Sequence, residues 1–160
     1  MTAPEPDSSP RSPLATEFSD AQDSPGLLLW QVTNTWQAAQ RAALKPYGLT
    51  HVQFVLLASL VWLDADGPVS QKQLADHAAA DAMMTSQVLR TLEERDLVRR
   101  EPHPSDRRAK ALAATEAGRE LVNRAIVAVE ACDREFFGAV GDDIGRLAAL
   151  LKQLAANRRG

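Results

Sequence analysis

The sequence predicts a mainly α-helical chain with a single β-hairpin. Apolar residues recur at helical spacing along most of the chain, several helix starts carry capping residues, and one stretch rich in arginine and proline, residues 97–112, interrupts the helical pattern. The length of 160 residues suits one compact domain with a hydrophobic core. The contents of 45% hydrophobic and 24% charged residues are typical of globular proteins, so a wholly disordered or fibrous chain is not expected.

Hydropathy and cysteine content narrow the class of protein further. No apolar run reaches the roughly 18 residues of a membrane span, and the N-terminus lacks the charged-then-apolar layout of a signal peptide. We therefore expect a soluble, cytoplasmic protein with no membrane partner. A single cysteine, Cys132, excludes an intramolecular disulfide and a multi-cysteine metal site within one chain.

Charges are distributed unevenly along the chain. Residues 1–25 hold five acids and one arginine, a net charge of -4, so the remaining residues carry +1 of the total of -3. Seven Lys or Arg residues and five acids lie within residues 86–110. The positive charge is therefore concentrated locally, where a phosphate backbone can meet it.

The N-terminal part of the chain predicts a tail and then a helix. Residues 1–23 contain four of the nine prolines together with Ser, Thr and acids, and they have too few large apolar residues to offset the entropy of ordering. They predict a disordered acidic tail. Ser24 and Pro25 then suit an N-cap and a first helical position, and the helix that they open should end at Pro46-Tyr47-Gly48.

Two capping boxes mark the starts of the next helices. Thr50 pairs with Gln53 and Ser70 with Gln73, and each box is flanked by an apolar pair suited to a hydrophobic staple. Asp81 can cap a third helix, in which apolar residues fall on one side and polar residues on the other. A short helix, a brief turn and a longer helix with a polar outer face form the helix-turn-helix pattern.

The stretch 97–112 predicts a β-hairpin with a basic tip. Pro102 and Pro104 would disrupt the middle of a sheet, but they suit a loop or an edge. A hairpin placed after three helices is a wing, so we expect a winged helix-turn-helix domain over residues 49–114.

The last third of the chain predicts two more helices. Thr115 starts a long helix with an apolar stripe at steps of three and four, a break with two glycines follows, and Asp142 or Asp143 caps the second helix. Sustained apolar seams on terminal helices favour packing against a partner chain. We therefore expect residues 24–48 and 115–157 to form a dimerisation region.

An ordered series of motifs runs through the predicted domain. The motifs are Leu49-Thr-x-x-Gln53-Phe54, Val69-Ser70-Gln71-x-x-Leu74-Ala75, Asp81-x-x-x-Thr85-Ser86-x-x-Leu89-Arg90-x-Leu92-Glu93, Leu97-Val98-x-Arg100, Asp106-Arg107-Arg108 and Leu112-x-x-Thr115-x-x-Gly118. In order and spacing this series resembles the multiple antibiotic resistance regulator (MarR) family, and the Asp-Arg-Arg wing is its most specific part. The resemblance covers residues 25–155. It implies a homodimer that binds DNA and regulates transcription in response to a ligand, more often as a repressor.

The resemblance places a helix like 82–95 in the major groove. Ser86, Gln87 and Arg90 would then meet bases or nearby phosphates, because arginine pairs bidentately with guanine, glutamine pairs with adenine and serine is short enough to reach a phosphate. Arginine on a helix face is also commonly a solvated charge. The other residues predicted to bind DNA near this helix are Ser70, which is also a helix cap, Gln71 and Thr85.

The resemblance also places a wing like 99–112 in the adjacent minor groove. Arg107 would enter the groove, whose potential is more negative where it is narrow. Asp106 would support that arginine, and Arg108 would lie beside it at the tip. A purely structural alternative is that the two arginines keep the hairpin edge from pairing with other chains.

A small-molecule effector is the third predicted partner. Aromatic side chains on or between the first two helices could recognise a planar anion or a phenol by stacking and by hydrogen bonds, although ordinary core packing explains aromatic residues equally well. The residues predicted to bind this ligand are Trp30, Trp36, Tyr47, His51 and Trp62.

The predicted function is a dimeric repressor that a small aromatic or phenolic ligand releases from a pseudo-palindromic operator, with half-site centres about 10 base pairs apart. Alternatives are a winged-helix module that binds only proteins, or a sensor on the same fold that works through Cys132 or a metal. The sequence has no glycine-rich phosphate loop, nucleophile elbow or paired histidines on a helix, so neither an enzyme nor a cofactor is expected.

Overall fold

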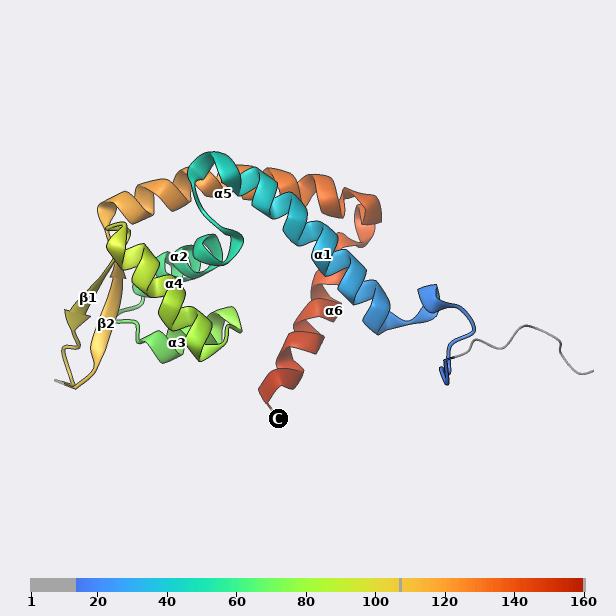
Figure 1. Ribbon diagram of the computed structural model, residues 1–160, viewed down its shortest axis with the longest axis horizontal. Helices are drawn as coiled ribbons and strands as arrows, with labels where there is room; N and C mark the ends of the chain where they lie inside the picture. Colours follow the sequence, from blue (N-terminus) through green and yellow to red (C-terminus); the bar gives the residue numbers. More distant parts are fainter. Residues whose placement is uncertain (1–13, 107, 160) are drawn as a thin grey trace, which may run out of the picture. The chain divides into compact units, whose positions relative to one another are not determined.

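The computed structural model describes residues 14–106 and 108–159, and these form helices and one hairpin (Figure 1). The chain divides into two compact units, Met1–Trp36 and Gln37–Gly160. The predicted mainly α-helical fold with a β-hairpin is confirmed. The main elements are α1 (Pro25–Leu44), α2 (His51–Asp64), α3 (Gln71–Ala78), α4 (Ala82–Glu94), β1 (Val98–Pro102), β2 (Lys110–Ala114), α5 (Glu116–Phe137) and α6 (Ile144–Ala156).

Both predicted capping boxes are present. Thr50 Oγ1 accepts a hydrogen bond from the Gln53 N–H at 3.2 Å, and Gln53 Oε1 accepts one from the Thr50 N–H at 3.0 Å. Ser70 and Gln73 make the same reciprocal pair at 3.1 and 2.8 Å. The Asp81 carboxylate caps α4 by accepting from the backbone N–H three residues later. Each cap satisfies backbone N–H groups that have no partner within the helix.

The predicted cap of the last helix is wrong. Asp143 occupies the N-cap position of α6, but its side chain makes no capping hydrogen bond. The chain enters α6 from a 3-10 segment, Gly138–Asp143, so Asp143 has near-helical backbone angles instead of the extended angles that let an aspartate fold back. Within this segment Gly141 adopts a φ of 55°, which makes the predicted break.

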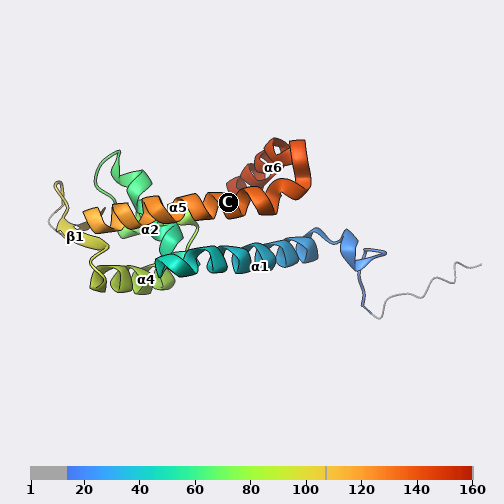
Figure 2. The same ribbon diagram turned by 90° about the horizontal axis from the view of Figure 1, so that it is seen from above.

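Helix α2 is central to the larger unit, where it packs against α3, α4, α5 and β2 (Figure 2). Its buried face meets leucines from the neighbouring elements, and the predicted staple residues are buried with them. The fully buried leucines of this core are Leu44, Leu56, Leu57, Leu60, Leu74, Leu89, Leu92 and Leu112. Burial of this apolar surface stabilises the helix-turn-helix as one body.

Strands β1 and β2 form an antiparallel pair in which Val98 lies opposite Ala114 and Pro102 lies opposite Lys110. Pro102 is the last residue of its strand, so its missing N–H interrupts no central ladder. Val69, just before α3, makes an isolated bridge to Leu112, whose N–H donates to the Val69 carbonyl at 2.7 Å. This bridge attaches the hairpin to the start of α3.

Long-range contacts hold the ends of α5 in place. At its start, the Thr115 hydroxyl donates to the Asp96 carbonyl at 2.6 Å and accepts from the Gly118 N–H at 3.0 Å. Further along, the buried Gln40 of α1 donates through Nε2 to Asp133 Oδ1 at 2.6 Å. The Thr-x-x-Gly motif noted in the sequence is therefore a helix start tied to the turn after α4.

In the described part of the chain, no single helix is both long and apolar enough to cross a membrane, although α1 with its 3-10 extension and α2 would pass that test as a bent pair.

Of the predicted tail 1–23, residues 1–13 lie outside the described residues, and Ala21–Asp23 form a short 3-10 helix. The predicted division into tail, dimerisation and DNA-binding regions stays a prediction.

Candidate nucleic-acid interface

Helix α4 has one buried face and one outer face. Thr85, Leu89 and Leu92 are fully buried against the core. Met83, Gln87 and Arg90, at spacings of four and three, are exposed on the opposite side, and Ser86 is half-buried at its margin. Because residues three, four and seven apart share a face of an α-helix, these side chains form a continuous outer stripe.

Thr85 is not on this stripe, contrary to its predicted place in a DNA-contacting set. Its side chain is fully buried and its hydroxyl donates to the Asp81 carbonyl at 2.8 Å. The hydroxyl is therefore satisfied inside the first turn of α4, and the methyl group packs with the core. Thr85 positions the helix rather than presenting a group to a ligand.

Arg90 is exposed in the middle of the stripe. Within the described residues, no carboxylate lies within ion-pair distance of its guanidinium. The five N–H donors of this side chain are thus available to an external acceptor. An exposed guanidinium without an ion pair on a helix face can bind either a base edge or a phosphate.

Ser70 and Gln71, at the start of α3, are already engaged. Ser70 Oγ serves as the helix cap, although its hydroxyl proton stays available as a donor. Gln71 Oε1 accepts from Arg100 Nη2 at 3.2 Å, so its predicted role at the interface competes with an internal hydrogen bond.

Arg100 joins three elements, and sequence reasoning did not single it out as a site residue. From β1 its Nε donates to Glu93 Oε1 of α4 at 2.8 Å, while its Nη2 reaches Gln71 of α3. The Arg100 and Glu93 side chains are only 29% and 27% exposed. The bridge therefore ties the wing strand to both helices of the helix-turn-helix. The sequence feature that could have pointed to Arg100 is the Leu97-Val98-x-Arg100 motif.

The wing turn is organised by Asp106. Its Oδ1 accepts from the Arg108 backbone N–H at 2.9 Å, and its carbonyl accepts from the Ala109 N–H at 3.3 Å. This local turn leaves the Arg108 side chain exposed. Arg107 lies outside the described residues, so its predicted support by Asp106 stays a prediction.

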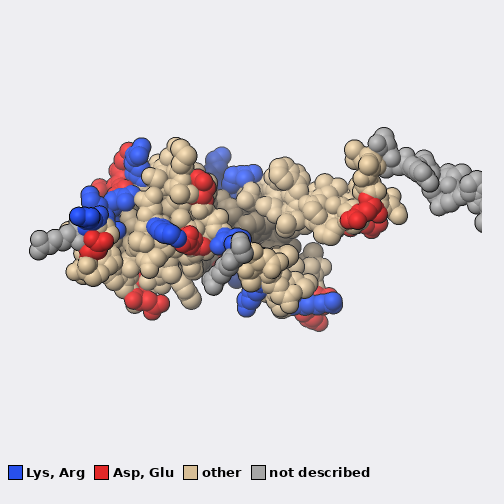
Figure 3. Space-filling model, turned by 90° about the horizontal axis from the view of Figure 1, so that it is seen from below, with Lys and Arg blue, Asp and Glu red and all other residues tan. Residues whose placement is uncertain are grey.

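Basic side chains gather around the hairpin of the larger unit (Figure 3). They are interspersed with acids, and two of the arginines here form ion pairs, Arg99 with Glu101 and Arg100 with Glu93. Among the described residues of α4 and the wing, the exposed cations without such a pair are Arg90, Arg108 and Lys110, so these groups most directly offer positive charge to a polyanion.

The predicted ligand-binding residues lie on several parts of the chain. His51 and Trp62 lie eleven positions apart on α2, which corresponds to about 16 Å along the helix axis. Tyr47 packs against the core near the start of α2. Trp30 and Trp36 belong to the smaller unit. A common effector site for these five residues stays a prediction.

Trp62 instead lines a cavity of about 480 Å³ between α2 and α5. Its side chain is 76% exposed, and the walls are mostly apolar with two polar side chains, Asp66 and Asn123. The remaining lining residues are Ala58, Val61, Ala65, Val122 and Ile126. An aromatic face, apolar walls and a few polar groups are the usual features of a small-molecule site.

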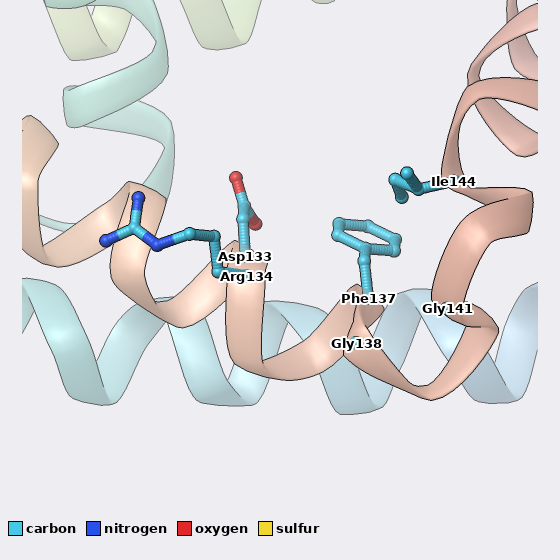
Figure 4. Close-up of a pocket in the computed structure, with 6 residues that line it drawn as sticks. All are labelled: Asp133, Arg134, Phe137, Gly138, Gly141 and Ile144. Carbon is cyan, nitrogen blue, oxygen red and sulfur yellow. The ribbon is translucent and has the colours of Figure 1, made fainter.

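A second hollow of about 310 Å³ lies where α5 gives way to the 3-10 segment (Figure 4). Phe137 points toward Ile144 across it, whereas the Arg134 side chain turns away (Figure 4). Asp133, at its edge, already accepts from Gln40. This hollow is lined mainly by apolar groups near the start of α6 and holds no cluster of chemistry-bearing groups.

Two titratable groups among the described residues, Cys132 and His51, have displaced pKa values. Burial first, then the charges of Asp133 and Glu135, raise the pKa of the Cys132 thiol, which keeps it protonated at neutral pH and lowers its reactivity. Burial first, then the charge of Arg41, lower the pKa of His51, and Asp133 opposes that shift. No group of three or more metal-ligating side chains occurs among the described residues.

A helix-turn-helix with an outward stripe on its second helix, followed by a two-stranded wing with an arginine tip, defines a winged helix-turn-helix protein of the kind that regulates transcription. Comparisons with known proteins agree. A model described as the MarR family matches residues 49–110.

Among curated relatives, an uncharacterized HTH-type transcriptional regulator, YdcH of Bacillus subtilis, is 45% identical over 125 residues, which span 78% of this chain and 85% of YdcH. The HTH-type transcriptional repressor Rv2887 of Mycobacterium tuberculosis is 36% identical over 115 residues, 71% of this chain and 80% of the relative. The chain therefore belongs to the MarR family of transcriptional regulators.

Solved structures extend the likeness to nearly the whole fold. CouR from Rhodococcus jostii RHA1, bound to p-coumaroyl-CoA, is 31% identical with a TM-score of 0.77, over 86% of this chain and 96% of CouR. The repressor CouR bound to a 23-mer DNA duplex is 26% identical with a TM-score of 0.72, over 89% of this chain and 98% of that one. The predicted winged helix-turn-helix fold is thereby confirmed.

Proposed function

We propose that this protein is a homodimeric repressor that binds a pseudo-palindromic operator through α4 and the wing. The observation that carries the proposal is the outer stripe of α4, where Gln87 and Arg90 are exposed and Arg90 has no internal ion pair among the described residues. Residues on the outer face of the second helix of such a motif contact base edges in the major groove. Repression is favoured by the relatives named as repressors, Rv2887 and CouR.

Dimerisation through the terminal helices is supported by α6. Its apolar stripe, Ile144, Leu151 and Leu154, is exposed in the single chain, and Leu154 is 61% exposed. Leucines repeating at helical spacing and open to water are stabilised by packing against another chain. We therefore assign residues 24–48 and 115–157 to the dimer and residues 49–114 to DNA recognition.

The first test is a titration of labelled DNA selected from a random library, at two salt concentrations, with random-sequence DNA as competitor. Wild type is compared with Arg90→Ala and with Arg124→Ala, which removes the same charge from an exposed position on α5. Loss of one good bidentate base contact weakens binding by about 1–3 kcal/mol. We expect that loss for Arg90→Ala and little change for Arg124→Ala.

Two outcomes would count against DNA recognition by α4. If selection enriches no sequence, the chain is better explained as a winged-helix module that binds only proteins. If Arg90→Ala and Arg124→Ala weaken binding equally, Arg90 contributes only a diffuse charge.

We further propose that an aromatic or phenolic effector binds at the Trp62 cavity and releases the DNA. The cavity lies between α2, which is central to the DNA-binding core, and α5, which leads into the dimerisation region. A ligand there would change how the two regions pack, and it would act only through a difference in affinity between the two arrangements. The p-coumaroyl-CoA in the CouR structure is an aromatic thioester of the expected class.

The effector is tested by adding p-coumarate or p-coumaroyl-CoA to the preformed DNA complex of wild type and of Trp62→Ala. Release from wild type at lower ligand concentration than from Trp62→Ala would support the site, provided that both bind DNA equally without ligand. Equal release from both proteins would place the effector elsewhere, and no release would exclude these two compounds as effectors.

A further inference from the structure

Met83 is a large apolar side chain exposed to water on the first turn of the recognition helix. It is 75% exposed, whereas the large apolar residues of α4 beyond the first turn face the core, with Leu89 and Leu92 fully buried and Val88 partly buried. Exposure of a single apolar residue is common in proteins. Its position is what matters here, because Met83 begins the same outer stripe that continues through Gln87 to Arg90.

The chemistry of this position differs from that of the rest of the stripe. Gln87 and Arg90 carry hydrogen-bonding groups that can pair with base edges, whereas the Met83 thioether offers mainly apolar surface and its sulfur is only a weak acceptor. In the major groove the apolar feature of a base edge is the C5-methyl group of thymine, which apolar side chains contact. Methionine is unbranched and flexible, so it can adapt to the shape of a neighbouring methyl group.

We propose that Met83 is a specificity-determining residue that contacts the C5-methyl group of a thymine in each half-site. This inference rests on the proposed function, since it requires that α4 enters the major groove. Two observations indicate that Met83 faces a base edge. It lies on the same stripe as Arg90, and it is in the N-terminal turn, the part of a recognition helix that contacts base edges.

The helix geometry also predicts where the thymine lies. Met83 and Arg90 are seven residues apart, which is about 10 Å along the axis of an α-helix. DNA rises about 3.4 Å per base pair, so the two side chains are separated by about three base-pair steps if α4 follows the groove. We therefore expect the thymine about three steps from the guanine that Arg90 contacts.

The neighbouring methionine provides a matched control. Met84 is also exposed, to 39%, but one helical position turns it about 100° away from Met83 and off the stripe. It has the same side chain, lies in the same turn and undergoes the same substitution. A difference between Met83→Ala and Met84→Ala therefore reports the direction in which the side chain points.

The experiment uses the full chain and the best sequence selected from random DNA. Each thymine of a half-site is replaced in turn by deoxyuridine, which keeps the base-pairing and hydrogen-bonding edges and removes only the methyl group. Dissociation constants are measured for wild type, Met83→Ala and Met84→Ala on every duplex, and thermal unfolding shows that the variants are folded.

We expect one position in each half-site at which deoxyuridine weakens wild-type binding about four-fold, the effect of losing one buried methyl group. Met84→Ala should keep this dependence, while Met83→Ala should bind the thymine and deoxyuridine duplexes equally well.

The inference is overturned if wild type binds every deoxyuridine duplex as tightly as the thymine duplex, or if Met83→Ala keeps the full dependence on the methyl group. A wild-type protein that selects no sequence would overturn the proposed function itself, so the two failures are distinguishable.

Discussion

At the scale of single residues, Gly118 is the position where the backbone leaves no room for a side chain. A Cβ atom built there would lie 2.1 Å from the carbonyl oxygen of Leu97 and 3.0 Å from its carbonyl carbon. The contact brings the start of α5 against the turn that follows α4. It explains on steric grounds why glycine ends the Thr115-x-x-Gly118 motif.

We expect Gly118→Ala to lower the free energy of unfolding by about 3 kcal/mol, because the added methyl group can be accommodated only by separating two backbone segments. Urea denaturation measures the loss. Gly138→Ala is the control, since a Cβ at Gly138 meets nothing within 4 Å. Equal effects of the two substitutions would contradict the close contact with Leu97.

His51 should make stability depend on pH. Because its folded pKa lies below the unfolded value of about 6.5, the unfolded chain binds a proton first as the pH falls. The contribution of His51 to the free energy of unfolding should therefore be fully present at a pH above the unfolded pKa. It should decrease as the pH falls from the unfolded pKa toward the lower, folded pKa. Urea titrations between neutral and mildly acidic pH should show a steeper decline for wild type than for His51→Gln. Parallel profiles would mean that His51 does not contribute.

At the scale of elements, the bridge from Arg100 to Glu93 and Gln71 sets how the wing meets the helix-turn-helix. Strand β1 is otherwise connected to α4 only through a short turn and local packing. A planar guanidinium with two partners on different helices restrains both distance and orientation. Arg100 is therefore a positioning residue for the interface that we propose.

A double-mutant cycle tests this bridge. We expect Arg100→Gln and Glu93→Gln to show a coupling energy of about 1 kcal/mol in unfolding experiments, the upper range for a partly exposed ion pair. Arg100→Gln should also weaken binding to the selected DNA more than binding to random DNA, because the wing and α4 lose their relative orientation. Strict additivity of the two substitutions would show that the ion pair contributes nothing.

At the scale of the whole molecule, the apolar stripe of α6 is left exposed by the described residues of the single chain. We expect Leu151→Glu to convert the proposed dimer to a monomer, since a carboxylate in an apolar interface is poorly solvated. Sedimentation velocity measures the oligomeric state of the variant. The affinity for an operator with two half-sites should fall while that for one half-site changes little.

Lys152→Glu is the control for this prediction, because residue 152 lies next to the stripe in sequence but on another side of the helix. It introduces the same carboxylate without entering the apolar stripe. A Leu151→Glu protein that sediments as wild type does would place the dimer interface elsewhere.

Much of the fold follows from local patterns in the sequence. The capping boxes at Thr50 and Ser70, the Asp81 cap and the hairpin are all found where they are predicted. The burial of Thr85 could also have been predicted from the sequence, because residues 85, 89 and 92 share one helical face. The Asp143 cap was wrong because capping depends on the backbone angles of the preceding segment, which residue type does not specify.

The sequence by itself determined the helices, their starts, the hairpin and the polar face of α4, because these depend on hydrogen bonds and spacings within a few residues. Only the tertiary structure showed that Arg100 bridges three elements, that Gly118 meets Leu97, and that Trp62 lines a cavity far from His51. These features join residues distant in the chain, and their geometry is decided by how the elements pack around α2.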